Sequence, residues 1–188
     1  MGERRHRPAY GAPVQFDLFP PPPLDTAADA ALAAKRPAGL FVGTASWTFT
    51  GWGGLVYRGR PTQAQLVVAG LEEYARHPLF NTVCIDRSFY APMSVDELAV
   101  YARQLPEGYR CGMKVWQAIC DPMSPQFLDA GFFKDAVLAP VDRAFAGHLG
   151  PLIFQFPPLR APPSPNELAW KLDRFFSRLP ESLECAVE

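Results

Sequence analysis

The sequence has no run of 18 or more apolar residues, so nothing in it predicts a membrane-spanning helix. Its four cysteines form no C-x-x-C pair and its three histidines show no metal-ligand spacing, which argues against a zinc site. The formal net charge of -1 gives no overall attraction to nucleic acid or to an acidic membrane surface. No apolar stretch resembles the core of a signal peptide. We therefore expect a cytoplasmic protein with no metal, no cofactor and no membrane partner.

The most prominent feature of the sequence is a set of five short apolar runs separated by helix-like stretches. They cover residues 40–43, 82–86, 111–115, 151–156 and 183–187. Strands that alternate with helices indicate parallel βαβ units, whose functional groups follow the carboxyl ends of the strands. We predict an α/β fold, a TIM-type (β/α) barrel that is incomplete, because about five strands and four helices fall short of the roughly 250 residues typical of that fold.

A five-stranded flavodoxin-like open sheet is the alternative fold, and 188 residues would suffice for it. Against it, residues 44–47 after the first run read Thr-Ala-Ser-Trp, which is too bulky for a phosphate-binding loop.

The chain divides near residue 38. Residues 1–38 are rich in Pro and Ala, with few large apolar side chains, and are predicted to be a mobile tail. Residues 39–188 are predicted to be the N-terminal part of the barrel domain. Helices are expected from about Thr62 to before Pro78, after Ser94 and after Ser164, and one helix is interrupted or started at Pro140.

Polar side chains follow four of the predicted strands. Counting by twos places Asp86, Lys114, Gln155 and Glu188 on the face opposite the apolar one. We predict that Lys114 stabilises a developing negative charge or, if desolvated, acts as a base or Schiff-base amine. Asp86 and Glu188 would then act as acid and base. The alternative is a charge-neutral network that merely fills the barrel interior, because buried charges must be paired in any case.

Aromatic residues at the same strand ends suggest a surface for stacking on a sugar ring or a base. The expected ligand contacts are the side chains of Trp47, Trp52, Ser88, Phe89, Tyr90, Trp116 and Gln155. Aromatic residues at strand ends also close hydrophobic cores, and this second interpretation stays open.

Several of these segments, in order along the chain, resemble the YecE-like family, known as domain of unknown function 72. They are residues 42–47, 80–83, 88–90 and 149–158, together with Trp52 and Lys114. The resemblance implies a TIM-type barrel of unestablished activity. The family commonly reads Val-Glu-Ile-Asn where this chain reads Val-Cys-Ile-Asp at 83–86, so its acidic residue lies two positions later. The family's fifth strand continues past a glutamate like Glu188 into three more βα units, so the chain looks truncated.

Residues 15–19, Gln-Phe-Asp-Leu-Phe, resemble the pentapeptide with which bacterial proteins bind the sliding clamp. Leu18 and Phe19 would be the apolar anchors and Gln15 the polar contact, with the prolines at 20–23 keeping the peptide extended. Alternatively, these side chains fold back onto the barrel floor. The sequence thus leaves three hypotheses. They are a barrel that binds a small polar, sugar- or nucleotide-like ligand, a DNA replication or repair protein tethered to the clamp, and a fragment without independent function.

Overall fold

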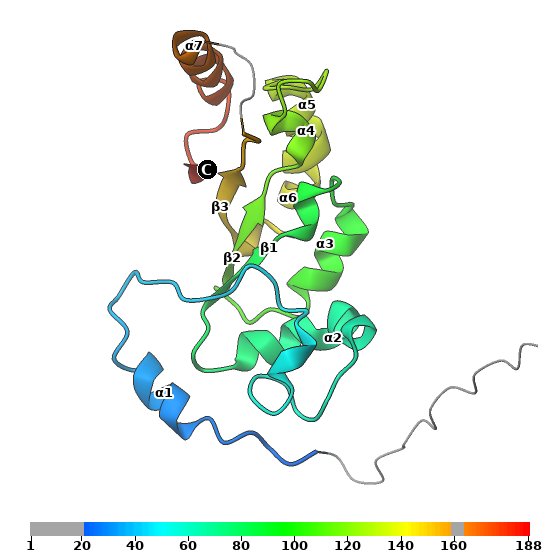
Figure 1. The fold of residues 1–188 in the computed structure, drawn as a ribbon, viewed down its shortest axis with the longest axis vertical. Coiled ribbons are helices and arrows are strands. Elements are labelled where there is room, and N and C mark those ends of the chain that lie inside the picture. The colour runs from blue at the N-terminus through cyan, green and yellow to red at the C-terminus, as the bar shows by residue number, and fades with distance from the viewer. Residues whose placement is uncertain (1–20, 159–163) are drawn as a thin grey trace, which may run out of the picture.

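The computed structural model describes residues 21–158 and 164–188. Four parallel strands form one sheet in the order β1-β2-β3-β4 (Figure 1). They are β1 (Thr82–Ile85), β2 (Arg110–Lys114), β3 (Leu149–Phe154) and β4 (Cys185–Val187). The sheet confirms the α/β class with parallel strands. The pentapeptide at 15–19 lies outside the described residues.

Seven α-helices accompany these strands in the described residues, and Figure 1 shows α3, α5 and α6 along one side of the sheet. The helices are α1 (Ala27–Ala33), α2 (Gln63–Arg76), α3 (Val95–Ala102), α4 (Gln117–Cys120), α5 (Ala130–Phe133), α6 (Ala139–Ala144) and α7 (Pro165–Phe176). No helix in the described part of the chain has both the length and the apolar character needed to cross a membrane.

The prediction of a strand at residues 40–43 is wrong. The segment runs beside β1, where Val42 O and Thr44 O accept from the N–H groups of Asn81 (3.1 Å) and Cys84 (2.9 Å). Its own N–H groups donate to side chains instead, Val42 N to Asn81 Oδ1 at 2.7 Å and Thr44 N to the Tyr74 hydroxyl at 2.9 Å. Side chains thus replace the regular ladder on this edge.

The predicted two-residue alternation is confirmed in β1; in β2 it holds for Met113 and Lys114, whereas Gly112, expected on the face of Lys114, is buried. Val83 and Ile85 are buried, as is Met113 on the neighbouring strand, whereas Cys84 and Lys114 on the other face are partly exposed. The buried face packs against the helices, and Phe154 of β3 contacts Phe133 and Phe175 there. The opposite face is left for polar groups.

Local capping explains where the helices begin. Thr62 and Ser94 each form a reciprocal capping box, with Gln65 and Glu97 respectively, so α2 and α3 start as predicted. Ser164 accepts from the Glu167 N–H, but the Glu167 carboxylate pairs with Lys171 at 3.0 Å instead of closing a box.

Pro140 is the second residue of α6, which follows a π-helical segment, Lys134–Leu138. The N–H of Ala139 donates to Lys134 O, five residues back. Proline has no N–H to continue the regular bond pattern, which accounts for a helix that changes its winding at the predicted interruption.

Residues 21–38, the described part of the expected tail, contain α1, which lies away from the sheet at its lower end in Figure 1. Two polar contacts join this part to the residues after α2. Arg36 Nη1 donates to Leu79 O at 3.0 Å, and Asp29 Oδ2 lies 3.6 Å from His77 Nε2.

Candidate functional site

Lys114 lies at the carboxyl end of β2 and joins the ends of the two neighbouring strands. Its Nζ is 3.0 Å from Asp86 Oδ1, directly after β1, and donates to Gln155 Oε1 at 2.8 Å, directly after β3. The parallel register causes this meeting, since Ile85 pairs with Met113 and Lys114 with Ile153. Three of the four residues of the predicted polar cluster are therefore in direct contact.

The Lys114 ammonium is held in its charged form. Its pKa is raised above 10.5, first by the hydrogen bond to Asp86, with desolvation acting in the opposite direction. The Asp86 charge and a weaker effect of Glu188 also raise the pKa. A group that is charged at neutral pH supplies positive charge and N–H donors, and is a poor base or Schiff-base amine.

The inner face of the sheet, defined as the face that carries Cys84 and Lys114, borders a cavity of about 570 Å³. Glu188 lines this cavity from the residue after β4, and its backbone pairs with Phe154 and Phe156. Burial raises the pKa of the Cys84 thiol, and the nearby Asp86 carboxylate raises it further. The thiol is thus kept protonated, which makes Cys84 a weak nucleophile.

Phe89 and Tyr90 form the aromatic side of the Lys114 site. The Lys114 Nζ lies 5.7 Å from the centroid of the Phe89 ring, within cation–π range. Tyr90 stands edge-on to Phe89 with ring centroids 5.4 Å apart, and 66% of its surface is exposed. Both rings follow β1 through the short 3-10 helix Arg87–Phe89.

Trp47 and Trp52, two further predicted ligand contacts, pack against other aromatic residues. Trp47 is a core residue, 4% exposed, whose indole N–H donates to Leu66 O at 3.1 Å and whose ring meets Tyr101 edge-on. Trp52 packs near Tyr57 and Tyr74 at 6.4 and 6.2 Å between centroids. The interpretation that strand-end aromatics close the core therefore holds for Trp47.

Ser88 and Trp116 also have structural partners. The Ser88 hydroxyl is buried within reach of two backbone acceptors, Ile85 O at 2.8 Å and Lys114 O at 2.6 Å. The Ser88 hydroxyl has one hydrogen to donate, and its two acceptors lie at the ends of β1 and β2, so it links these strand ends. Trp116 is partly exposed and packs against Phe132 at 5.7 Å between centroids.

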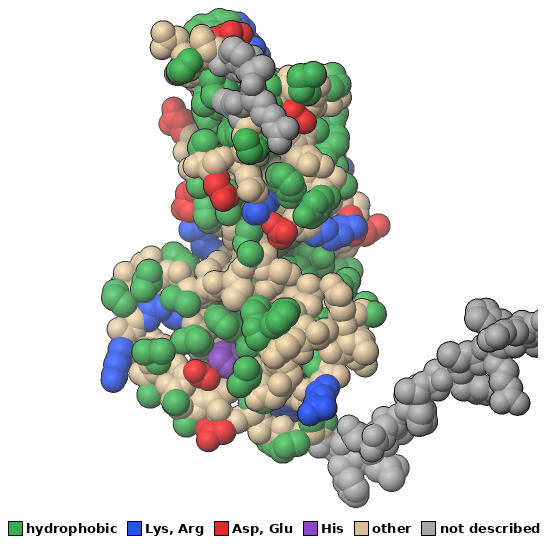
Figure 2. Space-filling view, in the orientation of Figure 1, with side chains coloured by type: hydrophobic (Ala, Val, Ile, Leu, Met, Phe, Trp, Pro, Cys, Tyr) green, Lys and Arg blue, Asp and Glu red, His purple; other side chains and the backbone are tan. Residues whose placement is uncertain are grey.

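A second ion pair on the inner face was not predicted. Arg110 Nη2 lies 3.1 Å from Glu184 Oε2, and its Nε donates to Leu149 O at 3.1 Å. Counting by twos backwards from Lys114 and Glu188 leads to Arg110 and Glu184, so the same pattern held the signal. Figure 2 shows side chains of both charges interspersed across the middle of the visible surface.

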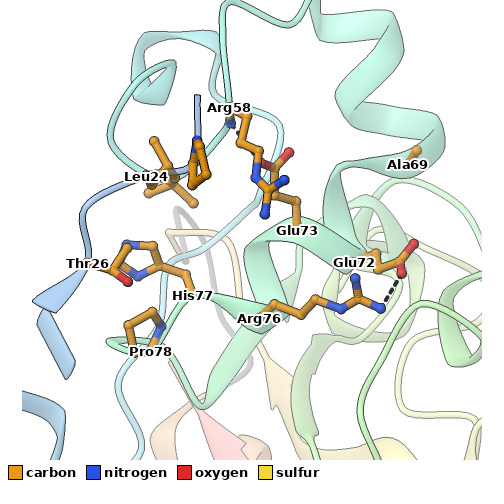
Figure 3. A pocket seen from close by; sticks show the side chains of 11 residues that line it. Leu24, Thr26, Arg58, Ala69, Glu72, Glu73, Arg76, His77 and Pro78 are labelled. Carbon is orange, nitrogen blue, oxygen red and sulfur yellow. Dashed lines mark hydrogen bonds and ion pairs between the residues drawn. The ribbon is translucent and has the colours of Figure 1, made fainter. Parts of the chain in front are cut away.

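Another cavity, of about 470 Å³, separates residues 23–26 from α2. Figure 3 shows the His77 ring there beside Thr26 and Pro78, with Glu73 and Arg58 nearby and Arg76 paired to Glu72. His77 is 6% exposed, and its Nε2 has no hydrogen-bond partner among the described residues, with Asp29 at 3.6 Å. The charged side chains around this cavity largely neutralise each other.

Within residues 21–158 and 164–188, no three His, Cys, Asp or Glu side chains are arranged to hold a metal ion. The cysteines 84, 111, 120 and 185 are free thiols.

Comparison with known proteins identifies one family and solved structures of its members. A family model described as "Protein of unknown function DUF72" matches residues 41–188. A crystal structure of a DUF72 family protein from Enterococcus faecalis V583 is 20% identical, with a TM-score of 0.55, and the match covers 78% of this chain and 49% of that one. One from Thermotoga maritima MSB8 is 18% identical, with a TM-score of 0.54, covering 78% and 55%. No curated protein matches the sequence. The chain therefore spans about half the length of these solved structures, and at these identities the likeness concerns the fold.

Proposed function

Because the chain belongs to the DUF72, or YecE-like, family of unknown function and has the TIM-barrel-like α/β fold of its solved members, we propose that it binds a small polar ligand beside Lys114, at the carboxyl ends of its strands. The ligand is of the sugar- or nucleotide-like kind. We also propose that the sheet, with residues 40–44 beside it, forms one side of a (β/α) barrel, since the matched structures are about twice as long as the matched part of this chain.

The geometry of the Lys114 ammonium carries this proposal. An ammonium group has three N–H donors, of which Asp86 and Gln155 take two. Among the described residues, no further hydrogen bond from Nζ is present, so one donor is available to a ligand oxygen. The side chain is 21% exposed, which leaves the ammonium accessible while its partners fix its position.

The neighbouring rings suit the ligand class. Phe89 lies against Lys114, and the exposed ring of Tyr90 follows it. An aromatic face beside a cation and a carboxylate accommodates a ring whose edge carries hydroxyl or phosphate oxygens. In this arrangement Lys114 and Gln155 orient the ligand, and Asp86 limits how much negative charge the site accepts.

Lys114 acts in this proposal as a permanent cation. It would stabilise negative charge that develops on the ligand, because its raised pKa keeps it protonated at neutral pH. The base and Schiff-base roles require the opposite shift, so we drop them. Asp86, which is paired with Lys114, and Glu188, which lines the cavity beside Lys114, remain the proposed acid and base.

A thermal-shift screen of this chain tests the proposal. The panel consists of neutral sugars, sugar phosphates and nucleoside monophosphates, tested on the native chain, on Lys114→Met and on Lys134→Met. Lys134 is an exposed lysine on the π-helical segment and is the matched control. At least one class should raise the melting temperature of the native chain and of Lys134→Met, but not that of Lys114→Met. Equal shifts in all three proteins would contradict the role of Lys114.

The pentapeptide at 15–19 supports a second proposal, tethering to a bacterial sliding clamp. A peptide of residues 14–21 should bind the clamp in the micromolar range, equivalent to about -8 kcal/mol. Changing Leu18 and Phe19 to Ala should abolish binding, because these apolar side chains are the proposed anchors. Fluorescence polarisation measures this directly, and micromolar binding by the double variant would refute the assignment.

A further inference from the structure

A groove between α7 and the loop before α5 combines one exposed and one partly exposed aromatic ring with several cations. It has a volume of about 240 Å³, and its lining includes Phe127, Trp170, Lys171, Arg174 and Arg178. We call it the α7 groove. Lys171, Arg174 and Arg178 follow one another at helical spacing, so one side of α7 and the turn after it supply all three cations.

The cations of the α7 groove are already aligned with its rings. The Arg174 guanidinium lies 4.7 Å from the Trp170 ring centroid, and Lys171 Nζ lies 5.9 Å from that of Phe127. Trp170 is 55% exposed, so much of its indole faces solvent. Leu128, next to Phe127, has a φ of 51°, an uncommon conformation for leucine, and lines the same groove.

The groove has more positive than negative charge. Lys171 is paired with Glu167 at 3.0 Å, whereas the ion pairs of the described residues include neither Arg174 nor Arg178. Two guanidinium groups that form no ion pair with the described residues thus line a groove with an exposed indole, in a chain whose net charge is -1. Their charge is complementary to an anion, and their planes are complementary to a flat ring.

We propose that the α7 groove binds a phosphate-bearing aromatic ring of the nucleotide kind. The ring stacks on the exposed Trp170–Arg174 pair, and Arg178 and Arg174 hold the phosphate. The volume lies below the roughly 300–1,000 Å³ usual for drug-sized ligands, which suits a single nucleobase with its phosphate. Such a unit occurs as a free mononucleotide or within a single nucleic-acid strand. The site shares no residue with the Lys114 site and does not depend on the function proposed there.

Quenching of tryptophan fluorescence tests this proposal on the full chain. The probes are AMP, adenosine, inorganic phosphate and a ten-nucleotide oligo(dA). AMP should quench saturably in the native chain. Adenosine should need at least about ten-fold higher concentrations for the same quenching, and inorganic phosphate at least about ten-fold higher concentrations than AMP to compete with it, because each offers only half of the contacts. Trp170→Phe should abolish most of the quenching, since Trp47 is buried and Trp52 and Trp116 are only partly exposed.

Charge variants separate the groove from general electrostatic attraction. Arg178→Gln and Arg174→Glu should each raise the dissociation constant of AMP about ten-fold or more. Arg103→Glu, an exposed arginine at the end of α3, is the matched control and should leave it unchanged. Arg178 follows the end of α7 and is exposed, so its replacement leaves the fold intact; unchanged melting temperatures verify this for each variant.

Binding of oligo(dA) distinguishes between the two possible ligands, a free nucleotide and a nucleic-acid strand. A dissociation constant more than ten-fold below that of AMP, with a steep salt dependence, assigns a nucleic-acid strand, and a value close to that of AMP assigns the free nucleotide. Both results support the groove. Absence of saturable quenching by AMP and by oligo(dA), or quenching that persists in Trp170→Phe and Arg178→Gln, overturns the proposal.

Discussion

Lys114 and Asp86 meet across the carboxyl ends of two parallel strands, with Nζ 3.0 Å from Oδ1. The register of β1 and β2 creates the pair, because the residues one position earlier, Ile85 and Met113, are backbone partners. The two side chains are 21% and 36% exposed, so the pair lies between a buried and a surface ion pair. The effect of this pair on stability and its effect on ligand binding can therefore be measured separately.

Lys114→Met should lower the free energy of unfolding by about 1–2 kcal/mol, between the values typical of exposed and of buried pairs. The methionine keeps most of the volume but leaves the Asp86 carboxylate without its partner. Urea denaturation measures the change, and Lys134→Met provides the baseline. A double-mutant cycle with Asp86→Asn should give a coupling of about 1 kcal/mol, and additivity of the two changes would contradict a direct interaction.

The contribution of Lys114 to stability should be independent of pH from about pH 7 to pH 9. Its pKa in the folded state is raised above 10.5, so the folded state holds the proton more tightly. The stabilisation is complete below the unfolded pKa and disappears as the pH rises through the folded value. The difference in unfolding free energy between the native chain and Lys114→Met should therefore shrink only in strongly alkaline solution. Shrinkage near neutral pH would contradict the direction of the pKa shift.

Gly43→Ala should destabilise the protein by about 2–3 kcal/mol, at the upper end of the cost of overpacking. A Cβ on Gly43 would overlap the carbonyl oxygen of Thr82 and lie 2.6 Å from its carbon. Backbone cannot rotate away, so residues 42–44 would separate from β1. Gly147→Ala is the matched control, because its Cβ would meet open space. Similar stabilities for both variants, measured in urea, would argue against close packing of the 40–44 segment.

Ser88→Ala should cost about 1–2 kcal/mol, the range for losing a hydrogen bond to a buried acceptor. The hydroxyl lies between Ile85 O and Lys114 O, so its loss loosens the end of β2 that carries Lys114. Ser177→Ala removes an exposed hydroxyl that donates to Arg174 O and should change stability by less than about 0.5 kcal/mol. Thermal melts of both variants measure these changes in stability. An unchanged stability of Ser88→Ala would contradict the structural role of the hydroxyl and leave Ser88 as a candidate ligand contact.

Local patterns predicted much of the fold. The alternation of Val83 and Ile85 with Cys84, and the capping residue Ser94, needed only neighbours in the sequence. The segment 40–44 failed as a strand because its N–H groups bond to the side chains of Asn81 and Tyr74, far along the chain. Helix α1 was missed since an Ala-rich stretch with no buried residue carries no amphipathic signal.

The candidate site was predictable where strand geometry decided it. Parallel strands of fixed register bring Asp86, Lys114 and Gln155 together, and counting by twos found them. The same reasoning misplaced Trp47, because the partner of its indole N–H, Leu66 O on α2, leaves no pattern in the sequence. Aromatic type alone does not distinguish a stacking surface from a core residue.

The protonation state of Lys114 is the most direct test of the account. In a chain labelled with ¹⁵N at the lysine Nζ, the signal missing from Lys114→Met identifies this group among four lysines. We predict that the Lys114 signal titrates above the ordinary range of a lysine, and that its chemical shift moves when a ligand from the thermal-shift panel is added. A titration midpoint near neutral pH would show a free amine, and would replace the charge-stabilising role with that of a base or a Schiff-base amine.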